Sequence, residues 1–424
     1  MSVKQSELTT YSEALEIIIR EAEAARHKNS KEAVPLDDLL NRFTAEPILA
    51  GFDLPRFDNS AVDGYGVLTG DIETASESSP VRLSLTGTIQ AGDRGDLAVA
   101  SGQTVKILTG APVPPSVEAV VMREFTRESE GTVEFFTGAG AGENIRRQAE
   151  EFKKGDQVLS AGKRVTPPVL GLIASFGHAV FPVAHAPRLA IVGTGDELVQ
   201  PGSTPLKGGQ IYDSNSHALR AAVLALGLPE PRIFHAGDNP EETEKAFESA
   251  LAESDLVISA GGVSVGDRDF VKATLEQKLG VRTIFWRVAV KPGKPVYFGY
   301  QEKAGGKRKL VFGLPGNPVS VLVTFHLFVK PALLALQGGM VKARTLKARL
   351  SKQIKKKPGR LDFIRGNMTS NENGTLQAIP TRGQDSHMLS GLAAAECLLH
   401  CRQEDSLLAE GDLMDIEILD WTNY

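Results

Sequence analysis

Near the N-terminus, apolar residues recur at helical spacing, at Leu15, Ile18, Ile19 and Ala22. Thr10 and Glu13 just before them have the spacing of a capping box. The pattern predicts an amphipathic helix over residues 10–28. A lone helix cannot bury its own apolar stripe, so we expect this stripe to pack against another part of the protein.

A strand-like pattern follows. Short runs rich in Val, Leu and Thr, such as 81–90 and 103–108, are separated by Gly, Pro and Asp across residues 63–142. This segment is predicted to be a small β-rich domain. Strand-like runs return after Gly339 and indicate a C-terminal all-β module, at 347–354, 360–368, 397–401 and 413–419.

Between these β-rich regions, residues 187–335 alternate apolar strands with helical segments. The strands are expected at 188–192 and 256–259, and the helices at 216–226 and 269–278. This alternation predicts a doubly wound, mostly parallel α/β sheet, whose ligands bind beyond the carboxyl ends of its strands. The apolar run 319–336 is interrupted by polar residues and a proline, and it indicates a buried helix rather than a membrane span.

Composition narrows the class of partner. A net charge of -5 gives no broad cationic field of the kind that nucleic acid or an anionic membrane requires, so small-molecule or protein partners are expected. Only Cys397 and Cys401 occur, and their spacing favours buried thiols in a strand over a metal site. The chain has few cysteines, and its N-terminal segment has neither the basic start nor the apolar centre of a signal peptide. Both features indicate a cytoplasmic protein.

Two strands of the predicted sheet end in loops suited to anions and metals. The strand 256–259 opens into a turn with Gly261, Gly262 and Ser264, where free amides at a helix start would seat an oxyanion. Glu197 and Asp269 follow the two strands and predict a magnesium site, since this ion accepts both carboxylate and phosphate oxygens. For Asp196 and Asp267 a helix cap is an equally good reading.

Two stiff turns come later in the same domain. Lys291 and Lys294 flank a Pro-Gly pair, and this rigid setting favours anion binding over a solvated turn. Pro315 and Pro318 shape a second turn directly before the buried helix. The run 355–357 consists of three lysines, for which a solvated strand end is favoured over an anion site.

Taken together and in this order, the motifs closely resemble the MoeA family of molybdopterin molybdenumtransferases and the E domain of gephyrin. The resemblance covers essentially the whole chain through FDNSAVDGYG, TGAPVP, ENIRR, TGDEL, IYDSN, AGGVSVGD, KPGKP, LPGNPVS and GRLDFIRG. Without it, FDNSAVDGYG and TGAPVP are equally well read as polar turns.

The resemblance implies an elongated multidomain chain that combines α/β and β-rich domains. Its parts would be an N-terminal helical and linker domain, an inserted β-rich domain, a central MogA-like doubly wound domain and a C-terminal β-barrel-like domain, at 1–62 with 143–186, 63–142, 187–337 and 338–424. It also implies a homodimer in which the α/β domain of one subunit faces the β-rich domain of the other. Adenylated molybdopterin, molybdate and magnesium would meet there, with release of AMP and molybdenum cofactor.

Functional residues carry over by position. The resemblance implies catalytic roles for Asp63, Glu197, Asp238 and Asp269, of which Glu197 and Asp269 would also bind magnesium. It implies substrate contacts for Thr109, Gly261, Gly262, Ser264, Arg287, Lys291, Lys294, Pro315, Pro318, Arg365 and Ser386. Among these, Lys291 and Lys294 suit phosphate, whereas Arg365 and Ser386 suit the molybdate oxyanion if the C-terminal module packs across the site.

Two positions depart from close members of the family. Glu151 replaces an Asp, and its extra methylene makes a direct magnesium ligand doubtful at that position. Arg287 replaces a Lys, which keeps the charge but changes its geometry.

The alternative functions are those of a MogA-like or CinA-like nucleotide-processing enzyme and of a gephyrin-like scaffold. The adenylyltransferase that prepares the substrate and the recipient molybdoenzymes are expected protein partners.

Overall fold

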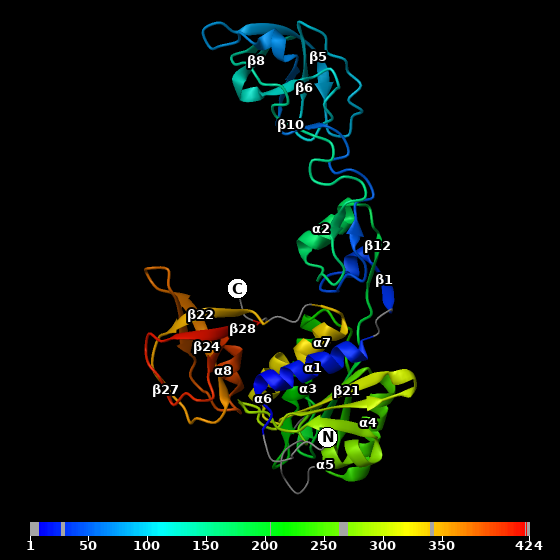
Figure 1. Cartoon of the computed structure of the whole chain (residues 1–424), viewed down its shortest axis with the longest axis vertical. Helices are drawn as coiled ribbons and strands as arrows, with labels where there is room; N and C mark the ends of the chain where they lie inside the picture. The colour runs from blue at the N-terminus through cyan, green and yellow to red at the C-terminus, as the bar shows by residue number, and fades with distance from the viewer. Residues whose placement is uncertain are drawn as a thin grey trace. The chain divides into compact units, whose positions relative to one another are not determined.

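A computed structural model describes most of the chain, namely residues 8–26, 30–203, 205–262, 270–339, 343–419 and 421. The chain forms two compact units (Figure 1). Unit 1 comprises Met1–Ala45, Gly162–Gly171 and Ala179–Tyr424, and unit 2 comprises Glu46–Ala161 and Leu172–His178.

Unit 2 is built around a six-stranded sheet with the order β7-β4-β6-β5-β9-β8. Its strands are β4 (Gly64–Val67), β5 (Val81–Ile89), β6 (Gln103–Ile107), β7 (Ala119–Met122), β8 (Thr126–Ser129) and β9 (Thr132–Phe135). Successive residues of a strand point to opposite faces, so Val120 and Val121 enter different apolar clusters on the two sides of the sheet. The strands predicted at 81–90 and 103–108 are confirmed as β5 and β6.

Unit 1 contains the predicted α/β sheet, with the order β16-β13-β17-β21-β20-β18. Its strands are β13 (Leu189–Thr194), β16 (Arg232–Ala236), β17 (Leu256–Ala260), β18 (Val281–Phe285), β20 (Tyr297–Glu302) and β21 (Arg308–Leu314). Strands β16, β13, β17 and β21 run parallel to one another, whereas β20 and β18 are antiparallel to their neighbours. The prediction of a mostly parallel sheet is therefore confirmed.

The helices of this sheet are α3 (Ser214–Ala225), α4 (Pro240–Glu253) and α5 (Phe270–Ala273). The helix predicted at 269–278 changes character after Ala273, because Thr274–Lys278 forms a π-helical turn. The predicted site residues Ser264 and Asp269 lie outside the described residues, as does the predicted cap Asp267.

The N-terminal helix α1 (Tyr11–Ala25) begins as the sequence predicts and ends three residues early. The Glu13 N–H donates to Thr10 Oγ1 at 3.3 Å, which confirms the cap. The apolar stripe, including Ile18 and Ala22, enters the main core of unit 1. Helix α1 packs there against α7 (Lys330–Leu336) (Figure 1). The stripe is therefore buried within its own chain.

The apolar run 319–336 is confirmed as a buried helix. It is formed by α6 (Pro318–Thr324), a π-helical turn at Phe325–Val329 and α7 (Lys330–Leu336). Pro331 has no N–H to donate, and the π-helical turn precedes it. Among the described helices, this one alone is long and apolar enough to cross a membrane, but 78% of its most apolar window is buried inside the protein.

The C-terminal module is a closed five-stranded barrel. Its strands are β22 (Thr345–Leu350), β24 (Leu361–Ser370), β25 (Leu376–Pro380), β26 (Cys397–Cys401) and β28 (Leu413–Ile418). The barrel closes because β24 pairs with both β25 and β26. The strand predicted at 347–354 is interrupted after Leu350, and β23 (Ile354–Lys355) pairs with β27 (Leu407–Leu408) instead.

Both cysteines are buried on β26, as the sequence predicts. Burial raises the pKa of each thiol to about 12, which keeps both in the unreactive thiol form at neutral pH. The remaining short elements are β1 (Lys31–Pro35), β2 (Ile48–Leu49), β3 (Asn59–Ser60), β10 (Ile145–Arg146), β11 (Gln157–Leu159), α2 (Pro167–Ser175), β12 (Val180–Ala184), β14 (Leu198–Val199), β15 (Ile211–Tyr212), β19 (Val290–Lys291) and α8 (Leu389–Ala393).

Candidate active site

The carboxyl ends of four parallel strands meet at one edge of the α/β sheet. Gly193 on β13 pairs with Ala260 on β17, and Ala260 in turn pairs with Leu314 on β21. Strand β16 ends beside them, where Thr194 pairs with Ala236. The loops after these strands carry the predicted residues Glu197, Asp238, Gly261, Gly262, Pro315 and Pro318. The register therefore brings together residues that are more than one hundred positions apart.

Gly261 and Gly262 are required by both conformation and space. Their φ angles are +96° and +65°, in the region that favours glycine. A Cβ on Gly261 would lie 2.8 Å from Thr194 Oγ1, and one on Gly262 would lie 2.5 Å from Val271 Cγ2. The backbone can therefore turn tightly at the edge of the sheet.

The acidic loop after β13 is fixed by its own backbone and by a neighbouring loop. Gly195 leaves room for the exposed Glu197 carboxylate, since a Cβ there would lie 2.4 Å from Glu197 Oε2. Asp196 Oδ1 accepts from the Asp238 N–H at 3.0 Å, so Asp196 joins two loops rather than capping a helix. The Asp238 side chain is exposed beside them.

The predicted magnesium site can be compared with these groups only in part. Within the described ranges, no three His, Cys, Asp or Glu side chains are grouped closely enough to hold a metal. Magnesium usually keeps several waters and takes one or two carboxylates together with substrate phosphates. The exposed Glu197 carboxylate, at the edge where an oxyanion is predicted to bind, is compatible with such coordination, and the pair with Asp269 stays a prediction.

A loop of the barrel reaches this edge. Asn317 Nδ2 donates to Ser386 Oγ at 2.9 Å, and the Val319 N–H donates to the Ser386 carbonyl at 3.2 Å. On the other side, Asn215 Nδ2 donates to the Gly316 carbonyl at 2.7 Å. Ser386, which the sequence places far from the α/β domain, therefore lies against the turn that follows β21.

Arg365 positions that barrel loop from inside. Its side chain is 1% exposed and donates from Nη2 to the carbonyls of Gly383, at 2.7 Å, and Asp385, at 3.3 Å. Burial lowers the pKa of Arg365, and the Asp385 carboxylate opposes that change. Arg365 thus holds the segment that carries Ser386, while its direct contact with an oxyanion stays a prediction.

Of the two predicted phosphate-binding lysines, Lys291 ends β19, which pairs with the barrel strand β24, and Lys294 follows that strand. This pairing places Lys291 opposite Asp362, with 3.7 Å between Lys291 Nζ and Asp362 Oδ2. Lys294 is exposed, and its carbonyl accepts from the N–H groups of Val288 and Val296. The turn is therefore fixed through its backbone, which leaves both ammonium groups accessible.

Arg287, the other predicted cation of this region, lies over the ring of Trp286, with its Cζ 4.9 Å from the ring centroid. Lys272 Nζ is 4.2 Å from the same centroid. These contacts are short enough for cation–π attraction. The ring orders both cations beside the KPGKP segment.

Asp63 and Thr109 belong to unit 2, whereas the other site residues above belong to unit 1. Asp63 Oδ1 accepts from both the backbone N–H and the hydroxyl of Thr109, each at 2.7 Å. These hydrogen bonds lower the pKa of Asp63, so its carboxylate is ionised at neutral pH. Glu151, at the position that departs from the family, is exposed in the same unit.

Three residues with clear roles in the geometry were absent from the predicted site. Asn317 and Asn215 hold the LPGNP turn, and Asp362 faces Lys291. The two asparagines lie inside recognised motifs, which is the only signal that the sequence offers for them. Asp362 also lies inside a recognised motif, GRLDFIRG, but nothing in that motif indicates its partner, which comes from the distant strand β19.

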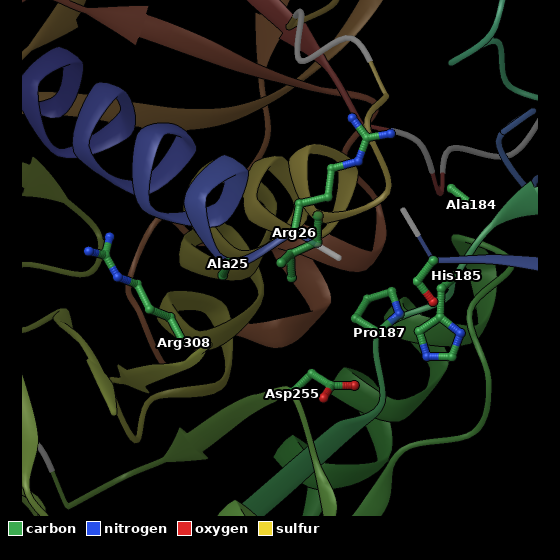
Figure 2. Close-up of a pocket in the computed structure, with 9 residues that line it drawn as sticks. Ala25, Arg26, Ala184, His185, Pro187, Asp255 and Arg308 are labelled. Atoms are coloured by element: carbon green, nitrogen blue, oxygen red, sulfur yellow. The ribbon is translucent and has the colours of Figure 1, made fainter. Parts of the chain in front are cut away.

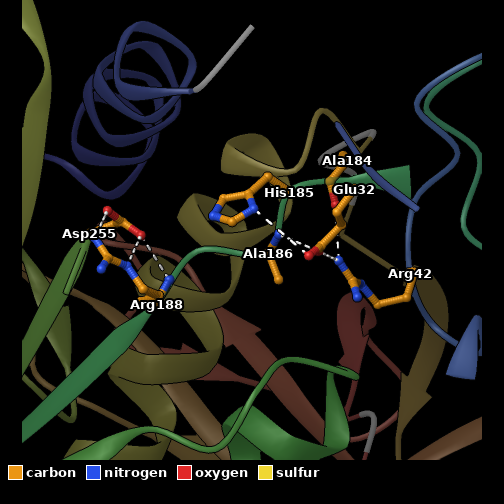
Figure 3. A network of polar contacts seen from close by, with 7 residues as sticks. All are labelled: Glu32, Arg42, Ala184, His185, Ala186, Arg188 and Asp255. Carbon is orange, nitrogen blue, oxygen red and sulfur yellow. Dashed lines mark hydrogen bonds and ion pairs between the residues drawn. The ribbon is translucent and has the colours of Figure 1, made fainter. Parts of the chain in front are cut away.

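A separate cavity lies at the opposite, amino edge of the sheet (Figure 2). Two charged residues of its lining form ion pairs, Asp255 with Arg188 and Arg308 with Glu21. Arg188 donates to both oxygens of Asp255, at 3.1 and 3.2 Å (Figure 3). Burial would raise the pKa of Glu32, but hydrogen bonds from Arg42 and the Ala186 N–H outweigh it and lower that pKa. These contacts join segments that are distant in sequence, which indicates a structural role for this edge.

Comparison with known proteins agrees with this geometry. Three family profiles match the chain: MoeA N-terminal region (domain I and II) at residues 9–177, probable molybdopterin binding domain at 190–335, and MoeA C-terminal region (domain IV) at 347–419. A molybdopterin molybdenumtransferase of Haemophilus influenzae is 39% identical over 91% of this chain and 93% of its own length. One from Synechococcus elongatus is 35% identical over 85% and 88%.

The solved structures agree as well. The crystal structure of a molybdopterin biosynthesis MoeA protein from Pyrococcus horikoshii superposes with a TM-score of 0.79 at 30% identity, covering 97% of this chain and all of that one.

Proposed function

The chain belongs to the MoeA family of molybdopterin molybdenumtransferases, enzymes of molybdenum cofactor biosynthesis, and from this premise we propose that it takes adenylated molybdopterin as substrate and releases AMP. The observation that carries the proposal is the contact of Ser386 with the LPGNP turn at the carboxyl edge of the sheet. Through that contact a barrel hydroxyl lies at the same edge of the sheet as the loops that carry Glu197 and the glycine-rich turn. A MogA-like enzyme would not account for it, because the barrel lies outside the matched molybdopterin-binding domain.

In the proposed reaction the oxygen bridge between the two phosphorus atoms of the anhydride breaks. Water adds its oxygen to one phosphorus, its proton leaves to solvent, and AMP is released. The two dithiolene thiols displace one oxygen of molybdate, which leaves as water with the two thiol protons, so two Mo–S bonds form and molybdenum stays Mo(VI). Lys291 and Lys294 would neutralise phosphate oxygens, and the exposed Glu197 would orient the attacking water. Backbone N–H groups of the turn after β17 would hold a further oxyanion.

Magnesium is part of the proposal. Glu197 together with Asp269 would hold it, and when bound it would neutralise charge on the phosphate oxygens. We also propose a cytoplasmic homodimer, in which Asp63 and Thr109 of one subunit serve the α/β domain of the other. The basis is that these two residues form a hydrogen-bonded pair with an ionised Asp63 in unit 2, whereas the other candidates lie in unit 1.

The direct test is AMP release from adenylated molybdopterin, with and without molybdate. We expect release that depends on molybdate in the wild type. Glu197→Gln should keep its fold and its substrate affinity, because volume and one hydrogen-bonding oxygen are retained. Its turnover should fall at least about tenfold, because the missing charge would weaken orientation of the reacting groups.

Glu404→Gln is a matched control, since Glu404 is an exposed carboxylate on the barrel. Absence of AMP release in the wild type would refute the proposed substrate. Normal AMP release by Glu197→Gln would show that the Glu197 carboxylate has no role in the reaction.

A further inference from the structure

A strongly basic cleft lies beside the KPGKP turn, on the barrel. It has a volume of about 390 Å³ and is lined by Lys291, Lys355, Lys356, Lys357, Arg360 and Asp362, which we call the basic cleft. Five of these six residues are cations and one is a carboxylate. Nothing in the proposed reaction uses the run 355–357, and the sequence by itself favours a solvated strand end there.

The floor of the basic cleft is fixed. Lys356 has a side chain only 2% exposed, and its Nζ donates to the carbonyls of Arg360 at 2.8 Å and Arg402 at 2.5 Å. The Asp362 carboxylate lies between Lys356, at 3.9 Å, and Lys291, at 3.7 Å. A buried lysine is held here by carbonyl groups and one carboxylate, so it cannot swing into solvent.

The rim carries the surplus charge. Lys355 and Lys357 are exposed and Arg360 is half-buried, and among the described residues none of the three forms a side-chain ion pair. Lys355 is the last residue of β23, and the Lys356 N–H that follows donates to the Ser406 carbonyl at 3.0 Å. Pairing with the chain near β27 therefore fixes the backbone that presents the lysines, although like charges held this close repel one another.

The size and chemistry of the basic cleft narrow the class of ligand. A water molecule takes about 30 Å³ of liquid volume, so a single tetrahedral oxyanion would leave most of the cleft filled with water. Its lining includes no aromatic side chain on which a nucleobase would stack. Several cations presented by a fixed backbone around a roomy cleft fit a ligand with two linked tetrahedral phosphates and no base.

We propose that the basic cleft is a binding site for diphosphate-type anions, separate from the carboxyl-edge site. Lys291 lines this cleft and also belongs to the KPGKP turn, so an anion in the cleft would share that cation with the active site. The proposal does not rest on the proposed reaction, because binding can be measured without molybdopterin or molybdate.

Calorimetric titration of the full chain with inorganic pyrophosphate tests the site. Lys355→Ala/Lys357→Ala should weaken pyrophosphate binding at least tenfold, and Lys356 is left unchanged because its burial makes it a folding residue. Lys347→Ala/Lys352→Ala removes the same net charge from exposed positions of the barrel and should change the affinity less than twofold. An equal loss in both double variants, or no loss in the first, overturns the proposal.

Two further ligands test the class of anion. Orthophosphate should bind at least tenfold more weakly than pyrophosphate, and equal affinity would overturn the diphosphate assignment. ADP should bind no more tightly than pyrophosphate. If ADP binds more tightly than pyrophosphate, and the Lys355→Ala/Lys357→Ala change abolishes that binding, the site recognises a nucleoside. This result would also overturn the diphosphate assignment.

Discussion

Gly293 determines how closely the KPGKP turn approaches the buried helix. Its φ is +99°, and a Cβ at this position would lie 2.2 Å from Thr324 Cγ2. Thr324 is fully buried and donates to the Ser320 carbonyl, so it has little room to move. The lysines on either side of Gly293 are therefore positioned by a contact that only glycine permits.

We expect Gly293→Ala to lower the free energy of unfolding by about 2–4 kcal/mol, the sum of backbone strain and overpacking. Gly305→Ala is the matched control, because Gly305 also has a positive φ, of +80°, but a Cβ there meets nothing within 4 Å. It should cost only about 1 kcal/mol. Equal losses in urea denaturation would show that the contact with Thr324 is unimportant.

Between elements, the barrel loop and the turn before α6 are joined by a side-chain hydrogen bond. Asn317, at the start of α6, donates to Ser386 on the barrel loop that Arg365 holds. Loss of either partner would free the same loop, so the two changes should not be additive.

In a double-mutant cycle on AMP release, Asn317→Ala and Ser386→Ala should couple by about 1 kcal/mol. Asn371→Ala with Ser386→Ala should be additive, since Asn371 lies in a different barrel loop and bonds only within it. Additivity in the first cycle would mean that Ser386 acts without the LPGNP turn.

A buried polar group also joins the long helix to the barrel. His326, within the π-helical turn, lies 2.9 Å from Glu417 on β28, and His400 on β26 lies 3.4 Å from the same carboxylate. Burial would raise the pKa of Glu417, but the hydrogen bond from His326 and the nearby His400 outweigh it and lower that pKa to about 2.

This shift makes the stability of the contact depend on pH. The folded pKa lies below the ordinary value of 4.5, so the stabilisation is present above pH 4.5 and is lost as the pH falls toward 2. Glu417→Gln should lower the free energy of unfolding by on the order of 2–3 kcal/mol at pH 6, and the deficit should shrink at pH 3.5.

Urea unfolding followed by tryptophan fluorescence measures this effect, because Trp421 packs on His326 with ring centroids 5.5 Å apart. Glu410→Gln, at an exposed carboxylate of the barrel, should have no such pH dependence. A deficit that is constant from pH 6 to 3.5 would rule out the charged form of Glu417 as its source.

For the whole molecule, the apolar stripe of the N-terminal helix offers no surface for the proposed dimer. The apolar stripe of α1 is buried in the core of unit 1, so removing residues 1–28 would open that core rather than report on association. The dimer rests instead on the division of the candidate residues between the two units.

Complementation tests this division. Asp63→Asn and Glu197→Gln should each be nearly inactive, and a mixture refolded together at equal amounts should recover about a quarter of wild-type AMP release. Half of the dimers would then be mixed, and each would have one intact site of two. No recovery, or a monomer in sedimentation that retains full activity, would exclude a site shared between subunits.

The sequence alone determined the local elements and the family. Period and capping are properties of neighbouring residues, so the start of α1 and strands such as β5, β6 and β26 were predictable from short windows. The motifs identified the family because their order along the chain can be determined without any knowledge of tertiary contacts.

Only the tertiary structure decided which charges meet. The parallel pairing of β19 with β24 sets Lys291 against Asp362, and Lys356, which follows β23, lies near the same carboxylate. Arg365, for which the resemblance implies a contact with an oxyanion, holds a barrel loop through its Nη2. Such outcomes depend on the register between strands that are distant in the chain, and no periodicity or spacing within a single segment encodes that register.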